Sequence, residues 1–134
     1  MKNHNWQETD KQFLEALLLA TGGEGGAPLQ EVLLMADAID GTVFTLKELE
    51  QILEKLVAAQ VLTIAKSKLA LSPAFVQQYE TITLQQGLKE NKDLLMSLLQ
   101  QQTITEATIA DAKTIVQKFK LKNQYQAYEE QFGG

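Results

Sequence analysis

The chain contains no cysteine and no arginine. Without cysteine it has neither a disulfide framework nor a thiolate for catalysis or metal binding. Arginine supplies the planar fork of donors that recognises phosphate and guanine, so its absence removes the favoured side chain for nucleic-acid binding. The 12 basic residues are all lysines, and 17 acidic residues bring the formal net charge to −5. A chain of this composition starts at a disadvantage for binding a polyanion.

The sequence also lacks any apolar run long enough to span a bilayer. Residues 1–8 are polar and contain no apolar segment of the kind found in signal peptides, so we expect a flexible N-terminal tail. Of the 134 residues, 45% are hydrophobic and 22% are charged, which is typical of a globular domain. We therefore expect a folded cytoplasmic protein that does not associate with membranes.

Catalytic and metal-binding patterns are missing as well. His4 is the only histidine and lies in the polar tail. Asp37 and Asp40 are three residues apart, but two carboxylates without further oxygen ligands make a poor cation site. The glycine-rich stretch 22–27 has no lysine to neutralise a phosphate, and Glu24 would repel one. The sequence therefore predicts a flexible connector at 22–27, no metal, no cofactor and no enzyme.

Two helices are expected in the N-terminal part of the chain, over residues 9–20 and about 29–39. Apolar residues recur there at three- and four-residue spacing, as they do on the buried face of an amphipathic helix. Thr9 and Gln12 have the spacing of a capping box at the start of the first helix. Gly41 follows the second helix and is a residue that commonly ends one.

The stretch from Thr45 to Ser72 carries the strongest local signals. Thr45 and Glu48 have capping-box spacing at the start of a third helix, and Phe44 and Leu49 hold the positions of a hydrophobic staple. The residues expected to face solvent on this helix are Lys47, Glu48, Glu50, Gln51, Glu54 and Lys55. The third helix is therefore predicted to be amphipathic and well capped.

A β-hairpin is predicted directly after the third helix. Two short β-prone runs, 61–65 and 69–71, flank the turn at Lys66-Ser67-Lys68. Ser72-Pro73 then has the composition of a helix start, with serine as the cap and proline at the first helical position. The fold class that follows is mainly α with a small β-hairpin.

The C-terminal half is rich in apolar residues at helical spacing. They form three stripes, at 94–99, 109–119 and 121–132. Thr103 and Glu106 have capping-box spacing, and a kink is expected near Asn123. These stripes are too dense to stay exposed on a soluble monomer. Either they fold back on the N-terminal part, or they are buried against a second copy or a partner.

The order helix, helix, capped helix, hairpin, helix resembles the winged-helix superfamily, particularly small bacterial MarR-like and PadR-like regulators. The resemblance covers residues of about 10–76. Its residues are Phe44-Thr45-Leu46-x-Glu48-Leu49 at the start of the third helix, then Leu53, Leu56-Val57-Ala58-Ala59 and Val61-Leu62. Gln60 stands at the turn after the third helix, where such proteins usually carry glycine.

This resemblance implies a winged-helix domain over residues 9–76 and a helical extension over 77–134. It also implies DNA binding by a dimer, through the third helix and the hairpin, which is the wing of such domains. The residues that would bind DNA are Lys47, Gln51 and Lys55 on the helix and Lys66 and Lys68 on the wing. Three acidic residues share the helix face with them and would repel the phosphate backbone, namely Glu48, Glu50 and Glu54.

Two functions remain open from the sequence. The first is a non-catalytic interaction module that binds another protein or a second copy of itself. It would use the third-helix face or a C-terminal aromatic stripe consisting of Tyr125, Tyr128 and Phe132. The second is a DNA-binding transcriptional regulator. Because the charge pattern disfavours DNA, we rank the interaction module first.

Overall fold

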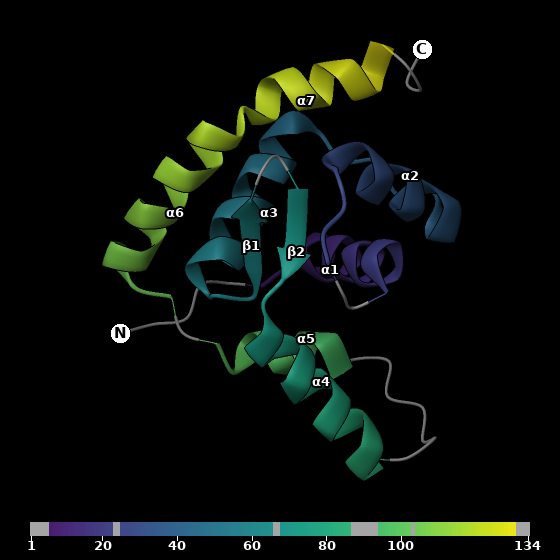
Figure 1. The fold of residues 1–134 in the computed structure, drawn as a ribbon, viewed down its shortest axis with the longest axis vertical. Helices are drawn as coiled ribbons and strands as arrows, with labels where there is room; N and C mark the ends of the chain where they lie inside the picture. Colours follow the sequence, from purple (N-terminus) through teal and green to yellow (C-terminus); the bar gives the residue numbers. More distant parts are fainter. Residues whose placement is uncertain (1–5, 23–24, 66–67, 87–93, 103, 131–134) are drawn as a thin grey trace.

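The computed structural model describes residues 6–22, 25–65, 68–86, 94–102 and 104–130. Within them it has seven α-helices and one antiparallel hairpin (Figure 1). The elements in chain order are α1 (Glu8–Thr21), α2 (Leu29–Asp40), α3 (Leu46–Ala58), β1 (Leu62–Ala65), β2 (Lys68–Leu71), α4 (Pro73–Gln86), α5 (Leu94–Gln100), α6 (Glu106–Phe119) and α7 (Leu121–Tyr128). The predicted fold class, mainly α with a small β-hairpin, is confirmed.

The core lies where α1, α2, α3 and the hairpin meet. Phe13 of α1, Leu29 of α2 and Leu53 of α3 have no exposed surface. The Phe13 and Phe44 rings meet edge to face, with 5.8 Å between their centroids and 70° between their planes. Burial of each such side chain contributes about 1.5–3 kcal/mol relative to leaving it in water. The apolar spacing read from the sequence therefore marks the buried faces correctly.

The hairpin gains a third strand position from the connector before α2. β1 pairs with β2 in antiparallel register, from Leu62 opposite Leu71 to Ala65 opposite Lys68. On its other side, β2 pairs with Ala27, whose N–H donates to the Leu69 carbonyl at 2.9 Å and whose carbonyl accepts from the Leu69 N–H at 2.8 Å. Residues 25–27 are thus not a plain connector. One bridging residue has no periodicity, so the sequence pattern did not reveal it.

Gly26 lets the connector approach β2 this closely. A Cβ atom at Gly26 would lie 3.1 Å from the Lys68 Cβ and 3.2 Å from the Leu69 carbonyl oxygen. Both distances are tighter than ordinary van der Waals contact. Glycine at this position therefore serves strand pairing, which is a use of the glycine-rich stretch unrelated to phosphate binding.

The capping box predicted for the third helix is confirmed. The Glu48 N–H donates to Thr45 Oγ1 at 3.1 Å, and the Thr45 N–H donates to Glu48 Oε1 at 2.8 Å. Ser72 also caps α4 as predicted, because its Oγ accepts from the Phe75 N–H at 3.3 Å and Pro73 is the first helical residue. Local sequence decides these two helix starts.

Two other predicted helix starts are wrong. α1 begins at Glu8, and the carboxylate of Asp10 accepts the Gln7 N–H at 2.8 Å, so Thr9 is not the cap. α6 is capped by Thr105, whose Oγ1 accepts from the Thr108 N–H at 3.1 Å; Thr103 lies outside the described residues. Residues that can cap a helix recur every few positions in these segments, so spacing alone does not select the right one.

The C-terminal helices fold back on the same chain. In Figure 1, α6 and α7 arch over one side of the molecule, while α4 and α5 lie together at the opposite end. α6 packs along α3, α7 packs on α2 and α3, and α5 packs on α1 and α4. The break between α6 and α7 falls at Lys120, which has a φ of 58°, rather than near Asn123. The buried stripe of α6 consists of Ala112, Val116 and Phe119.

Candidate functional site

The predicted DNA-reading face of α3 is only partly open to solvent. Lys47 and Gln51 are exposed, as predicted. Lys55 is not on the solvent face, because only 14% of its side chain is exposed. The structure thus brings the first two candidates to one surface and separates the third from them.

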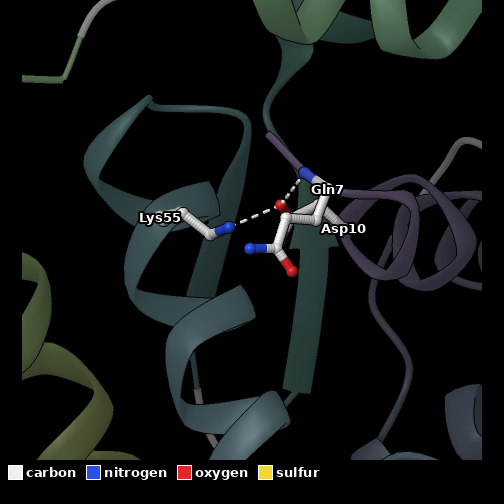
Figure 2. A network of polar contacts seen from close by, with 3 residues as sticks. All are labelled: Gln7, Asp10 and Lys55. Atoms are coloured by element: carbon white, nitrogen blue, oxygen red, sulfur yellow. Dashed lines mark hydrogen bonds and ion pairs between the residues drawn. The ribbon is translucent and has the colours of Figure 1, made fainter. Parts of the chain in front are cut away.

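Lys55 is held by an acidic residue of the first helix. Figure 2 shows its side chain reaching from α3 to Asp10 on α1, where Nζ lies 2.5 Å from Oδ2. The same Asp10 oxygen accepts the Gln7 N–H at 2.8 Å. Asp10 has no exposed surface, and the Lys55 ammonium lies 5.6 Å from the centroid of the Trp6 ring. A charge-assisted bond in this setting fixes Lys55 for structure, so it is not available to a phosphate.

Trp6 and Asp10 complete this buried network. Trp6 is half-buried and packs on the core, so residues 1–8 are not a flexible tail throughout; residues 1–5 lie outside the described part. In the described part of the chain, neither Trp6 Nε1 nor Asp10 Oδ1 has a hydrogen-bond partner, although both atoms are buried. Its contacts with the core and with Lys55 make Trp6 a packing anchor.

α6 covers part of the surface of α3 that the sequence predicts to be exposed. The two helices pack side by side, and Lys113 of α6 interacts electrostatically with Glu54 of α3. Burial raises the pKa of Glu54, and Glu50 raises it further, while Lys113 opposes the rise. Glu54, expected toward solvent, is therefore half-buried beside α6. A helix that enters a DNA groove needs a clear approach along its length, and α6 occupies one side of that approach.

The hairpin, which is the predicted wing, offers one lysine in the described residues. Lys68 is exposed at the start of β2, and Lys66 falls outside the part of the chain that the structure describes. The predicted hairpin is present, and Lys68, expected in its turn, pairs with Ala65 as the first residue of β2, while residues 66–67 lie outside the described residues. Lys68 on the hairpin is therefore a third exposed residue of the predicted DNA surface, beside Lys47 and Gln51 on α3.

The C-terminal tyrosines contact the protein's own core. The Tyr125 hydroxyl donates to the Phe44 carbonyl at 2.7 Å, and both Tyr125 and Tyr128 are half-buried against the core. Burial, ahead of nearby carboxylates such as Glu129 and Asp37, raises the pKa of both hydroxyls. Of the two arrangements left open for the C-terminal stripes, α7 folds back onto α2 and α3, and the binding of a partner by these tyrosines stays a prediction. Phe132 lies outside the described residues.

A groove between β1 and α6 is a feature that the sequence pattern did not reveal. It has a volume of about 570 Å³ and is lined by Leu62, Thr63 and Ile64 of β1 and by Thr108, Asp111 and Ile115 of α6. Val57 and Ala58 of α3 and the start of α4 also line it. We call it the β1–α6 groove. Its α6 residues recur at helical spacing next to the buried stripe, and this is the sequence signal that would have indicated it.

Chemistry-bearing clusters are scarce in the described residues. No group of three or more histidine, cysteine, aspartate or glutamate side chains there is arranged to hold a metal ion. None of the described helices has the length and apolar character needed to cross a bilayer. Searches against protein-family models, curated proteins and solved structures find no match to this chain.

Proposed function

We propose that this protein is a non-catalytic, cytoplasmic winged-helix module whose function is to bind another protein. The element order supports the winged-helix assignment, since a three-helix unit is followed directly by an antiparallel hairpin. The pairing of Ala27 with β2 adds support, because it places a strand position between α1 and α2 on the sheet. Gln60 has a φ of 63°, so it takes the left-handed conformation for which related proteins use glycine.

The observation that carries the proposal is the packing of α6 along α3. This contact occupies one side of the helix that a winged-helix regulator would insert into DNA. Lys55 is bound to Asp10, and Glu50 is exposed on the same helix, so little positive charge is left there. The net charge of −5 adds a general repulsion toward nucleic acid.

DNA binding is the second candidate, favoured by the exposure of Lys68 on the wing. Together with Lys47 and Gln51 it would provide the contacts to phosphate and base edges. These are few compared with the phosphate contacts that specific DNA-binding proteins make. We therefore rank the regulator second.

Two measurements separate these functions. The first is fluorescence anisotropy of a labelled mixed-sequence duplex titrated with the full chain at low and at physiological salt. We expect no binding at physiological salt. Tight binding there that Lys47→Glu with Lys68→Glu abolishes would establish the regulator and overturn the proposal.

The second measurement is affinity capture by the immobilised chain from a nuclease-treated lysate of its own source, followed by calorimetry with the purified partner. We expect a direct complex that does not depend on nucleic acid. Substitutions at Tyr125 and Tyr128 are unsuited to this test, because these side chains pack on the core and their loss would act through stability. Failure to find any direct partner would contradict the proposal.

A further inference from the structure

We propose that the β1–α6 groove binds an extended segment of a partner protein, which adds to β1 as a further strand and carries a basic residue toward Asp111. This inference rests on the proposed function and assigns the binding surface. It commits to one occupant, an apolar and basic peptide in an extended conformation. Such recognition gains affinity from main-chain hydrogen bonds and specificity from the pockets that alternate side chains enter.

The first step in the argument is the direction of the β1 backbone groups. In an antiparallel pair, opposed residues alternate between pairs that exchange hydrogen bonds and pairs that do not. Leu69 directs its N–H and carbonyl to Ala27, so it does not exchange them with Ile64, its opposite residue on β1. The N–H and carbonyl of Ile64 therefore point away from β2. By the same alternation, those of Leu62 do so too.

The second step is the position of the groove. Leu62, Thr63 and Ile64 all line it. Successive side chains of a strand point to opposite faces of the sheet, so a cavity over one face would not be lined by three consecutive residues. The groove therefore runs along the free edge of β1, where the outward N–H and carbonyl groups are.

The third step is the character of the opposite wall. Thr108, Asp111 and Ile115 stand three and four residues apart and form one stripe of α6. Ile115 is a large apolar side chain that remains 38% exposed, and Ile64 across the groove is half-buried. A segment lying between β1 and α6 would bury both side chains, which favours an apolar residue in the ligand.

Charge specifies the rest of the ligand. Asp111 is the one charged residue among the described residues that line the groove, and it is exposed. A lysine or arginine in the ligand would complement it, and the net charge of −5 would assist the approach of a basic segment. A second copy of this acidic chain is the less suitable occupant for the same reason. Its binding is an outcome that the test detects.

The edge itself lacks the usual protection. Natural edge strands commonly carry lysine, proline or a bulge that prevents pairing with another chain. Residues 62–65 of β1 are Leu, Thr, Ile and Ala, with no charge and no proline. An unprotected edge bordered by an apolar groove is what strand addition requires.

The test uses a displayed library of random peptides panned against the full-length chain. We expect enriched peptides with alternating apolar residues and at least one lysine or arginine. Ile64→Pro removes the outward N–H of β1 at a position where proline is tolerated, because that N–H makes no bond within the sheet. The affinity of a synthetic enriched peptide should fall by about tenfold or more, the effect of losing one or two hydrogen bonds and the strand contact.

Matched variants separate the groove from general effects on folding. Ile115→Lys should weaken the peptide as Ile64→Pro does. Ile64→Val and Leu19→Lys should not, because the first keeps the N–H and the second changes an apolar side chain, 55% exposed, outside the groove. Asp111→Lys should reverse the charge preference, binding a peptide in which glutamate replaces the basic residue. Peptide binding should also slow hydrogen exchange of the Ile64 amide.

Several outcomes would overturn the inference. They are enrichment of no peptide, equal binding to all variants, or peptides with no basic residue whose binding ignores Asp111→Lys. Self-association of the chain that is lost in Ile64→Pro would assign the edge to a second copy instead. If a captured partner binds the Ile115→Lys variant as well as the wild type, the groove assignment fails while the proposed function stands. If no partner exists at all, both fail.

Discussion

The ammonium nitrogen of Lys55 lies 2.5 Å from Oδ2 of Asp10, and the Asp10 side chain has no exposed surface. The pair joins α3 to α1 across 45 positions of sequence. The Asp10 carboxylate also accepts the N–H at the start of α1, so one buried side chain both starts a helix and fixes its neighbour. This relationship changes Lys55 from a candidate DNA contact into a structural residue.

Breaking this pair should destabilise the protein strongly. Lys55→Met leaves the Asp10 carboxylate buried without its counter-charge, which costs about 3–5 kcal/mol of unfolding free energy. Urea unfolding followed by Trp6 fluorescence measures it, since the Trp6 ring lies beside the pair. The double variant Asp10→Leu with Lys55→Met should recover most of the loss, because both charges are then removed from the interior.

Lys11→Met is the matched control for the buried pair. Lys11 forms an ion pair of 2.9 Å with Glu8, whose side chain is 63% exposed. The Lys11 side chain is 17% exposed, but solvent reaches the Glu8 carboxylate and screens the pair, so loss of the pair should cost no more than about 1 kcal/mol. Equal losses for Lys11→Met and Lys55→Met would show that burial does not strengthen the dependence of Asp10 on Lys55.

Glu54 should make stability depend on pH. Its pKa is raised above the ordinary value of 4.5, first by burial, so the folded state holds the proton more tightly than the unfolded state. The contribution of this group is therefore fully present below pH 4.5 and is lost as the pH rises through the folded-state pKa. Glu54→Gln should raise the melting temperature relative to wild type more at neutral pH than under acidic conditions.

Glu80→Gln provides the control for this pH dependence. Glu80 is exposed on α4, so this variant removes a carboxylate that is not buried. Calorimetric melting across the acidic to neutral range measures both variants. A Glu54→Gln effect that is the same at every pH would show that desolvation of this carboxylate does not influence folding.

Gln60→Gly should stabilise the turn between α3 and β1. Gln60 has a φ of 63°, a conformation that costs a residue with a Cβ atom about 1–2 kcal/mol and costs glycine little. The Gln60 carbonyl, which accepts from Ser72 Oγ at 2.7 Å, is kept by glycine. Glycine also adds conformational entropy to the unfolded chain, which offsets part of this stabilisation. We therefore expect the free energy of unfolding to rise by up to about 1 kcal/mol.

Gln51→Gly is the matched substitution for this prediction. Gln51 is exposed within α3, where glycine costs about 1 kcal/mol relative to a good helix former. The two variants should therefore change the unfolding free energy in opposite directions in chemical denaturation. A loss at both positions would show that the left-handed conformation of Gln60 carries no strain.

Local signals predicted much of the fold. The Thr45–Glu48 capping box, the Ser72–Pro73 helix start and the hairpin depend on residues a few positions apart, and all three are present. The starts of α1 and α6 were placed wrongly, because several nearby residues have the required spacing. At α1 the cap is Gln7, and its N–H donates to Asp10, whose partner Lys55 belongs to another helix.

The candidate site was the least predictable part. The exposed positions of Lys47, Gln51 and Lys68 follow from helix and hairpin periodicity. Periodicity does not predict the packing of Tyr125 on the protein's own core or the β1–α6 groove, because each joins segments that are distant in sequence. An apolar stripe shows that a surface will be buried, but it does not name the surface that buries it.

The sequence by itself determined where the helices and the hairpin form, since capping groups, turn residues and apolar spacing act over a single helical turn or strand. Only the tertiary structure decided that α6 lies along α3, that Lys55 is bound to Asp10, and that the edge of β1 borders a groove. The physical reason is range. A charged side chain pairs with, and an apolar side chain packs against, whichever residues the fold brings within a few ångströms. The same lysine or tyrosine can therefore contact a partner in one fold and the protein's own core in another.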